Sequence, residues 1–256
     1  MFAALQLADA LRTMGHPAAL VEKIDTNSPN LHIIYGAHNH MHLPKRYIIY
    51  QTEVAGSHHF SPRYLQYIRR AVAVWDYNAF NTIAYCHINH NVHIVPPWVS
   101  SANSVTNCST DVDKDIPILF YGWVNGSTRR ECLLEETNKQ LQIRNLPIIH
   151  IVTNTLGRDM WQLLSRTQVV LNLHYFHNSP LELFRITEAL SHNCHVVSEG
   201  PVDVNYNKTV SFATTPVSIA LTIGALLGSP PFLCDGYVQP SIQKPLHHLQ
   251  RAVSFM

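Results

Sequence analysis

Short apolar strands alternate with amphipathic helices along nearly the whole chain, and this rhythm restricts the fold more than any other feature. Short runs rich in β-branched and aromatic residues indicate strands, for example Ile148–Val152 and Val169–His174. Longer segments with apolar residues at three- and four-residue steps lie between them and indicate helices. This alternation is typical of βαβ units, in which helices cover both faces of a parallel sheet. We therefore expect an α/β protein.

One polar stretch interrupts the rhythm. Ser, Thr, Asn and Asp dominate residues 99–115, which show no apolar period and read as an interdomain linker. The expected organisation is two Rossmann-like domains that face a cleft, because ligands of open α/β sheets bind at the carboxyl ends of the strands. The expected boundaries are a first domain at 1–98, the linker at 99–115, a second domain at 116–234 and a helical tail at 235–256.

The expected elements of each domain follow from the same patterns. The expected strands are 31–35, 46–50, 72–75, 92–95, 118–121, 148–152, 169–174, 195–198 and 210–213. The expected helices are 2–14, 61–70, 78–86, 128–141, 158–166, 181–191 and 218–227.

Charge and cysteine content exclude several classes of protein. The formal net charge is +1, so a broad electrostatic nucleic-acid binder is not expected. No apolar run is long enough for a transmembrane helix, and the first residues lack the basic region of a signal peptide. The 5 cysteines are widely spaced without a C-x-x-C pair, which favours free thiols and a cytoplasmic location.

The densest group of polar residues follows the expected strand 169–174. Glu182, Arg185 and Glu188 are three residues apart, so they can share one helix face. The start of that helix presents free backbone N–H groups for a diphosphate, and Arg185 adds a bidentate cation. Glu188 can accept hydrogen bonds from two ribose hydroxyls. The alternative is a solvated ladder of salt bridges on a helix surface.

Residues 156–200 resemble the donor-binding half of group 1-type glycosyltransferases of the GT-B fold. The motifs that carry the resemblance are V-L-N-L-H-Y at 170–175, the E-x-x-R-I-x-E-A-L helix at 182–190 and V-V-S-E at 196–199. The first half is similar as well, and the segments YIIYQTE (47–53), VWDYNAFN (74–81) and VHIVP (92–96) occur in the order of that family.

The resemblance implies an enzyme that transfers a sugar from a UDP- or GDP-type nucleotide sugar to a hydroxyl of a saccharide, lipid or protein. It implies that Arg185 holds the diphosphate and Glu188 the ribose, and that neither a metal nor another cofactor takes part. The other residues expected at the donor site are Glu182, His174, Tyr175, Asn125, Gly126, Glu199 and Arg158.

The acceptor half is less complete. Members of the family open with a strand and a glycine-containing loop, whereas this sequence starts within the following helix, so the first domain is expected to be truncated. The base of an inverting enzyme normally comes from this half. The candidates are Glu53, His58, His59 and Asp76, residue types that at such positions are more often structural than catalytic. A catalytically impaired nucleotide-sugar-binding relative is therefore the alternative function.

The chain holds 17 histidines, which raise a third possibility, a histidine-rich metal-binding module. Three clusters stand out, at 38–42, 58–59 and 87–93. None of them comes with the C-x-x-C or H-E-x-x-H spacing of known zinc sites. GT-B enzymes generally stabilise the leaving diphosphate with cationic side chains and helix N-termini. No metal site is therefore expected, and most histidines are expected to be surface residues.

Overall fold

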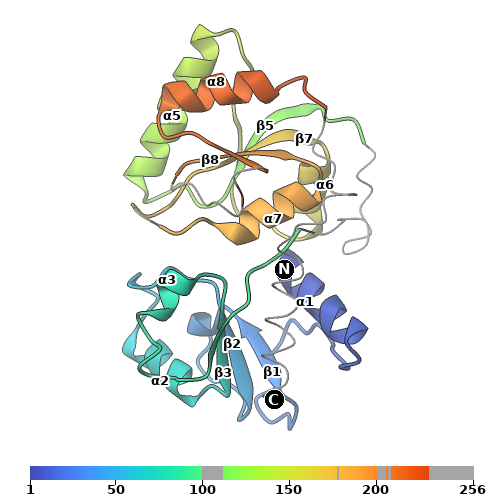
Figure 1. Ribbon diagram of the computed structural model, residues 1–256, viewed down its shortest axis with the longest axis vertical. Coiled ribbons are helices and arrows are strands. Elements are labelled where there is room, and N and C mark those ends of the chain that lie inside the picture. Colours follow the sequence, from blue (N-terminus) through green and yellow to red (C-terminus); the bar gives the residue numbers. More distant parts are fainter. Residues whose placement is uncertain (100–111, 178, 201–205, 207–208, 231–256) are drawn as a thin grey trace. The chain divides into compact units, whose positions relative to one another are not determined.

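The computed structural model describes residues 1–99, 112–177, 179–200, 206 and 209–230. It divides into two compact units (Figure 1). The first-sheet unit comprises residues 7–98, and the second-sheet unit comprises residues 1–6 together with the described residues from 99 onward. Most of the expected linker and all of the expected C-terminal tail lie outside the described residues.

The first-sheet unit contains four parallel strands in the order β1-β2-β3-β4. These strands are β1 (His32–Tyr35), β2 (Tyr47–Gln51), β3 (Ala73–Asp76) and β4 (Val92–Ile94). The helices associated with them are α1 (Phe2–Thr13), which begins in the other unit, η1 (Ala37–Asn39), α2 (Pro62–Arg70) and α3 (Ala79–Thr82).

Helix α2 packs on this sheet through one apolar stripe. Its Tyr64 and Ile68 are buried against Ile49 and Val74 of the central strands. Ser61 caps the helix by accepting a hydrogen bond from the backbone N–H of Tyr64, and proline occupies the first helical position. The amphipathic pattern and the cap together explain why this helix forms where the sequence predicts it.

Helix α3 is shorter than the sequence predicts. The expected helix spans 78–86, but α3 ends at Thr82 and turns follow it. The Thr82 hydroxyl donates to the carbonyl of Ala79 at 2.7 Å, which satisfies a backbone acceptor at the helix end. Beyond this end Tyr85 turns inward, where it is fully buried and its hydroxyl donates to Asp76.

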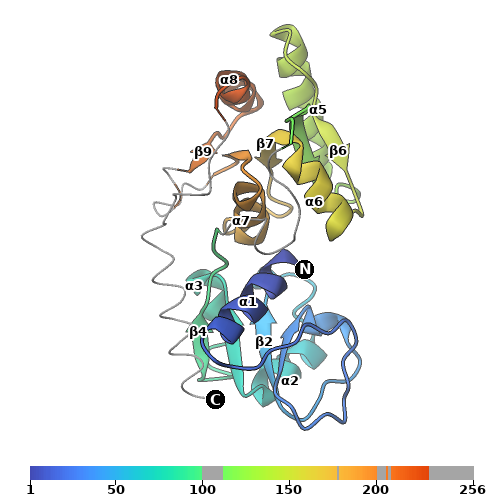
Figure 2. The same cartoon turned by 90° about the vertical axis from the view of Figure 1, so that its right-hand side faces the viewer.

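The second-sheet unit contains five parallel strands in the order β6-β5-β7-β8-β9. These strands are β5 (Ile116–Tyr121), β6 (His150–Val152), β7 (Thr167–Asn172), β8 (His195–Ser198) and β9 (Val210–Phe212). The helices are α5 (Thr128–Ile143), α6 (Arg158–Ser165), α7 (Leu183–Ser191) and α8 (Pro216–Leu226). In Figures 1 and 2, α5 and α8 lie on one face of this sheet and α6 and α7 on the other.

The core of this unit sits between the sheet and the pair α5 and α8. Ile118, Phe120, Leu171 and Val197 have no exposed surface, as expected of strands covered on both faces. Two parallel sheets with Rossmann-like connections confirm the α/β class that the rhythm of the sequence predicts. None of the described helices combines the length and the apolar character that crossing a bilayer requires.

Candidate functional site

The carboxyl ends of β5, β7 and β8 lie side by side, because these three strands are parallel neighbours in the second-sheet unit. Charged residues that follow these strands in the sequence meet at this edge. They are Arg129, Arg130, Glu182, Arg185 and Glu199, which we call the ionic cluster. This is the edge at which ligands of parallel α/β sheets bind.

Arg185 is held by two acceptors on the protein. Its Nη1 lies 2.5 Å from Glu182 Oε2 and donates to Asn172 Oδ1 at 2.7 Å. The side chain is only 13% exposed. Gly122 lies against the guanidinium with a φ of 140°, and a Cβ at this position would come within 2.7 Å of Arg185 Nη2. Only glycine therefore fits here, both for the backbone angle and for the space that the arginine takes.

Glu182 lies between two arginines. Its Oε1 is 3.1 Å from Nη2 of Arg130, whose Nη1 donates to the carbonyl of Trp123 at 2.7 Å and whose Nη2 also donates to Leu173. Burial raises the pKa of Glu182, but the charges of Arg185 and Arg130 outweigh it and lower the pKa to about 2. Burial lowers the pKa of Arg130 to about 10, so both groups are charged at neutral pH.

Glu199 fixes the end of β7 rather than projecting freely. It forms an ion pair with Arg129, and its Oε2 accepts the backbone N–H of His174 at 3.1 Å. Arg129 also donates to the carbonyl of His174 at 3.1 Å. The His174 ring is buried, and neither of its nitrogens has a hydrogen-bond partner among the described residues, although Nδ1 lies 3.8 Å from Glu182 Oε1.

Glu188 lies one helical turn beyond Arg185 and is held separately from the ionic cluster. Its two oxygens accept hydrogen bonds from Trp161 Nε1 at 3.0 Å and from the Tyr121 hydroxyl at 3.2 Å. Burial raises the pKa of Glu188, although these two hydrogen bonds counter the shift. A solvated ladder of salt bridges along α7 does not describe this arrangement, because the Glu182–Arg185 pair is largely buried and Glu188 forms no described ion pair with Arg185.

The remaining residues expected at the donor site differ in position. Asn125 and Gly126 are exposed in the loop after β5, and a Cβ on Gly126 would lie 3.5 Å from the Tyr175 hydroxyl, so this loop adjoins Tyr175. Arg158 is exposed at the first residue of α6 and makes none of the contacts of the ionic cluster. The structure thus brings Tyr175 to the site and leaves Arg158 outside the cluster.

Sequence reasoning missed Arg129, Arg130, Asn172 and Gly122. One signal was present in the sequence: two adjacent arginines begin α5, although cations are unfavourable in the first turn of a helix. Such a placement indicates a specific anionic partner, which here is Glu199 for Arg129 and Glu182 for Arg130.

Asp76, a candidate base in the first-sheet unit, is a buried carboxylate that accepts hydrogen bonds from its neighbours. It has no exposed surface, and its carboxylate accepts hydrogen bonds from the Asn78 N–H at 2.8 Å, from Asn81 Nδ2 at 3.3 Å and from the Tyr85 hydroxyl. Burial raises the pKa of Asp76 to about 6 despite these bonds.

This raised pKa predicts a defined pH dependence of stability. Between about pH 4 and 6 the folded protein keeps a proton on Asp76 that the unfolded chain releases, so stability falls as the pH rises through this window. Relative to Asp76→Asn, the wild type is expected to lose about 2–3 kcal/mol of unfolding free energy between pH 4 and 7. Urea denaturation of both proteins at each pH measures the difference, and parallel pH profiles would contradict the expectation.

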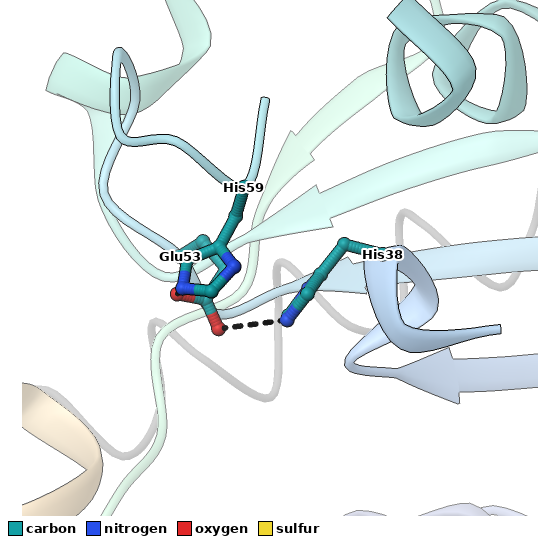
Figure 3. Close-up of side chains that lie close together, drawn as sticks. All are labelled: His38, Glu53 and His59. Atoms are coloured by element: carbon teal, nitrogen blue, oxygen red, sulfur yellow. Dashed lines mark ion pairs between the residues drawn. The ribbon is translucent and has the colours of Figure 1, made fainter. Parts of the chain in front are cut away.

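The other candidate bases, Glu53, His58 and His59, lie together beyond the carboxyl end of β2, and Figure 3 shows Glu53 and His59 with the neighbouring His38. His38 Nε2 lies 3.7 Å from Glu53 Oε1, and His59 Nε2 lies 3.6 Å from Glu53 Oε2. The His58 ring packs against that of His59, with 3.9 Å between the centroids. Burial lowers the pKa of His38, and the charge of Glu53 counters only part of this shift.

Comparisons with known proteins show a similarity of fold but no closer relation. No family model and no curated protein sequence matches the chain. Among solved structures, TarM aligns with a TM-score of 0.52 at 10% identity over 98% of this chain and 57% of TarM. The Glycosylation Associate Protein (Gap123) complex from Streptococcus agalactiae aligns with a TM-score of 0.50 at 11% identity, over 92% of this chain and 56% of the other.

The pneumococcal O-GlcNAc transferase GtfA, in complex with UDP and GlcNAc, is more distant, with a TM-score of 0.45 at 9% identity over 82% of this chain and 49% of GtfA. The chain therefore spans about half the length of these proteins. The expected truncation of the first domain stays a prediction. With its two Rossmann-like parallel sheets, the chain has a fold that resembles GT-B glycosyltransferases.

Proposed function

We propose that the protein is a glycosyltransferase that takes a sugar from a nucleotide-sugar donor of the UDP or GDP type, bound at the ionic cluster, and transfers it to a hydroxyl acceptor. The observation that carries the proposal is the placement of Arg185. It lies at the carboxyl edge of a Rossmann-like sheet, at the start of α7 and against a glycine that leaves room for its head. The GT-B-like fold is in keeping with this function.

Glu182 pairs with two arginines, so Arg185 can bind an anion without leaving the Glu182 carboxylate unpaired. Glu182 also contacts Arg130 at 3.1 Å, so it keeps a cationic partner when Arg185 turns to a phosphate oxygen. A guanidinium suits this exchange because it binds phosphate in a bidentate fashion. The first N–H groups of α7 add partial positive charge for the same anion.

Glu188 is proposed to hold the ribose. Trp161 and Tyr121 each donate to a different carboxylate oxygen, which fixes the orientation of the group and leaves each oxygen with acceptor capacity for a hydroxyl. The ribose then lies next to a diphosphate at Arg185, because the two residues are one turn apart on α7.

Catalysis in this proposal is electrostatic. As the bond between the sugar and the diphosphate breaks, negative charge develops on the leaving phosphate, and the fixed cation and helix dipole stabilise it. The protein's own cations supply this stabilisation, so no metal is assigned to the donor end. The acceptor hydroxyl is proposed to be positioned by the first-sheet unit.

One set of contacts favours the second candidate, a binding protein without turnover. Asp76 is buried and its carboxylate accepts hydrogen bonds from three donors, so it is not placed to take a proton from an acceptor. An assay of UDP or GDP release, with and without mixed saccharide acceptors, separates the two functions. Acceptor-dependent release supports the enzyme, and tight binding without release supports the alternative.

Gly122→Ala tests the space around Arg185. The added methyl group would come within 2.7 Å of Arg185 Nη2, so the guanidinium must move, and we expect the affinity for the nucleotide sugar to fall by about tenfold or more. Isothermal titration calorimetry measures the affinity.

The control is Gly228→Ala, a glycine of the same unit that has a φ of 81° and open space around it, because a Cβ added there would meet nothing within 4 Å. Both variants carry the strain of a positive φ, of about 1 kcal/mol, but only Gly122→Ala disturbs Arg185. Equal nucleotide affinities in the two variants would show that Arg185 does not depend on this space.

A further inference from the structure

We propose that His38, Glu53 and His59 form a binding site for one divalent transition-metal ion, with Zn²⁺ as its natural probe. The three residues come from two of the histidine clusters and from the end of β2, so no spacing within one cluster reveals them. Two imidazoles and one carboxylate are a ligand set that catalytic zinc sites use, with a fourth position left for water.

The distances between the three side chains fit ligands around a shared cation better than they fit direct hydrogen bonds between the side chains. His38 Nε2 and His59 Nε2 lie 3.7 and 3.6 Å from the two oxygens of Glu53, which is longer than a hydrogen bond. One ligand atom from each residue lies within 4.8 Å of the others. Metal–ligand bonds of about 2.0–2.2 Å place the ligands of a tetrahedral ion roughly 3.3–3.6 Å apart, so small side-chain shifts complete the site.

His38 is a buried histidine that faces Glu53. Its side chain is only 9% exposed, its Nδ1 has no hydrogen-bond partner among the described residues, and its Nε2 lies 3.7 Å from Glu53 Oε1. Because this separation is longer than a hydrogen bond, a metal ion bound at Nε2 would satisfy the nitrogen that points toward Glu53 (Figure 3). The edge of the ring rests against Tyr64, with 5.9 Å between the centroids, which restricts its rotation.

Hydrogen bonds around Glu53 hold the backbone of this central residue in place. The carbonyl of Glu53 accepts from Asn81 Nδ2 at 3.1 Å, and the backbone N–H of Glu53 donates to Gln51 Oε1 at 3.4 Å. The Tyr64 hydroxyl donates to the same Gln51 oxygen at 2.6 Å. Metal sites depend on such outer contacts to orient their ligands. The site is therefore largely formed before an ion binds.

The position of the site suggests what the ion can do. His38 and Glu53 follow β1 and β2, so the site is at the carboxyl end of the first sheet, where ligands of α/β sheets bind. Because the described residues supply three ligands, a bound ion keeps an open position for water or for an oxygen of a ligand. This proposal does not depend on the donor site, because none of its residues belongs to the second-sheet unit.

The test is a titration of the full chain, purified without a histidine tag and freed of metal, with Zn²⁺ in competition with a chromogenic chelator. We expect one tightly bound Zn²⁺ per chain, and a loss of affinity of roughly a hundredfold in Glu53→Gln and in His59→Ala. Co²⁺ serves as a spectroscopic probe, whose visible absorption bands report nitrogen and oxygen ligands and are expected to disappear in both variants.

The matched control is His90→Ala, because His90 is an exposed histidine of the same unit without a described contact, and this variant is expected to bind Zn²⁺ like the wild type. Circular dichroism and melting temperatures of the metal-free proteins show whether each variant folds. Weak binding of several Zn²⁺ ions that is equal in all four proteins, or no stoichiometric binding by the wild type, would overturn the proposal. Neither result bears on nucleotide binding at Arg185.

Discussion

Replacing Arg185 with alanine is expected to lower the affinity for the nucleotide-sugar donor by about a hundredfold or more. Arg185 is the cation of the ionic cluster that lies in the first turn of α7, and its removal leaves the Glu182 carboxylate with Arg130 as its arginine partner. The same change removes the donor to Asn172, so a loss of about 1–3 kcal/mol of stability is also expected. Calorimetric titration below the melting temperature measures the affinity.

The matched control is Arg166→Ala. Arg166 belongs to the same unit and pairs with Asp115 at 2.5 Å, but both side chains are about half exposed, at 46% and 53%. An exposed pair contributes little to stability, so this variant is expected to fold and to bind the donor like the wild type. Equal affinities in Arg185→Ala, Arg166→Ala and the wild type would remove Arg185 from the donor site.

Replacing Arg130 with alanine is expected to have the largest effect on stability, a loss of about 3–5 kcal/mol. Its side chain is only 3% exposed. It contacts Glu182 and donates to the carbonyls of Trp123 and Leu173, so it links three segments at the carboxyl edge of the second sheet. It also lies over the rings of Phe120 and Tyr175, with 5.3 Å to each centroid. The substitution leaves buried acceptors without donors and opens a space beneath the site.

Lys139→Ala is the control on the same helix. Lys139 pairs with Glu135 at 3.1 Å, but its side chain is 56% exposed, so its loss is expected to change stability only slightly. Guanidinium chloride denaturation of both variants measures the two free energies. If Arg130→Ala were as stable as Lys139→Ala, the ion pair with Glu182 would not hold the edge together.

The rhythm of the sequence predicted the layers of the fold because it reflects burial, which is a local property of each strand and helix. Strands such as 46–50 and 169–174 are apolar enough to be recognised alone, and the structure places strands there. The end of α3 was not predictable in this way. It depends on the burial of Tyr85 against Asp76, a contact between residues whose neighbours in the sequence give no sign of it.

The candidate site was predictable only in part. The spacing of Glu182, Arg185 and Glu188 predicts a shared helix, and the structure places Arg185 and Glu188 in α7 with Glu182 as its N-cap. Most partners of these residues come from other elements. Asn172 and Gly122, which hold Arg185, are ordinary strand-end residues in the sequence. The order of the strands in the sheet brings these residues together, and neither composition nor spacing contains that order.

The same reason explains why the histidine clusters did not predict the set around Glu53. Each cluster was assessed by its own spacing, and none has the spacing of a known zinc site. The set around Glu53 combines His38, which follows β1, with His59, which precedes α2, so it exists only because β1 and β2 are parallel neighbours. Its role as a metal site departs from the expectation drawn from the sequence and is a proposal for experiment.

The most direct test of the proposed function is a calorimetric titration of the wild-type chain with UDP- and GDP-sugars, with UMP and GMP as comparison ligands. The ionic cluster predicts one binding site, and it predicts that a diphosphate sugar of one of the two bases binds at least about ten times more tightly than the matching monophosphate, because Arg185 and the start of α7 act on the diphosphate. Absence of binding by every nucleotide sugar at millimolar concentration, with the protein folded, would contradict the account.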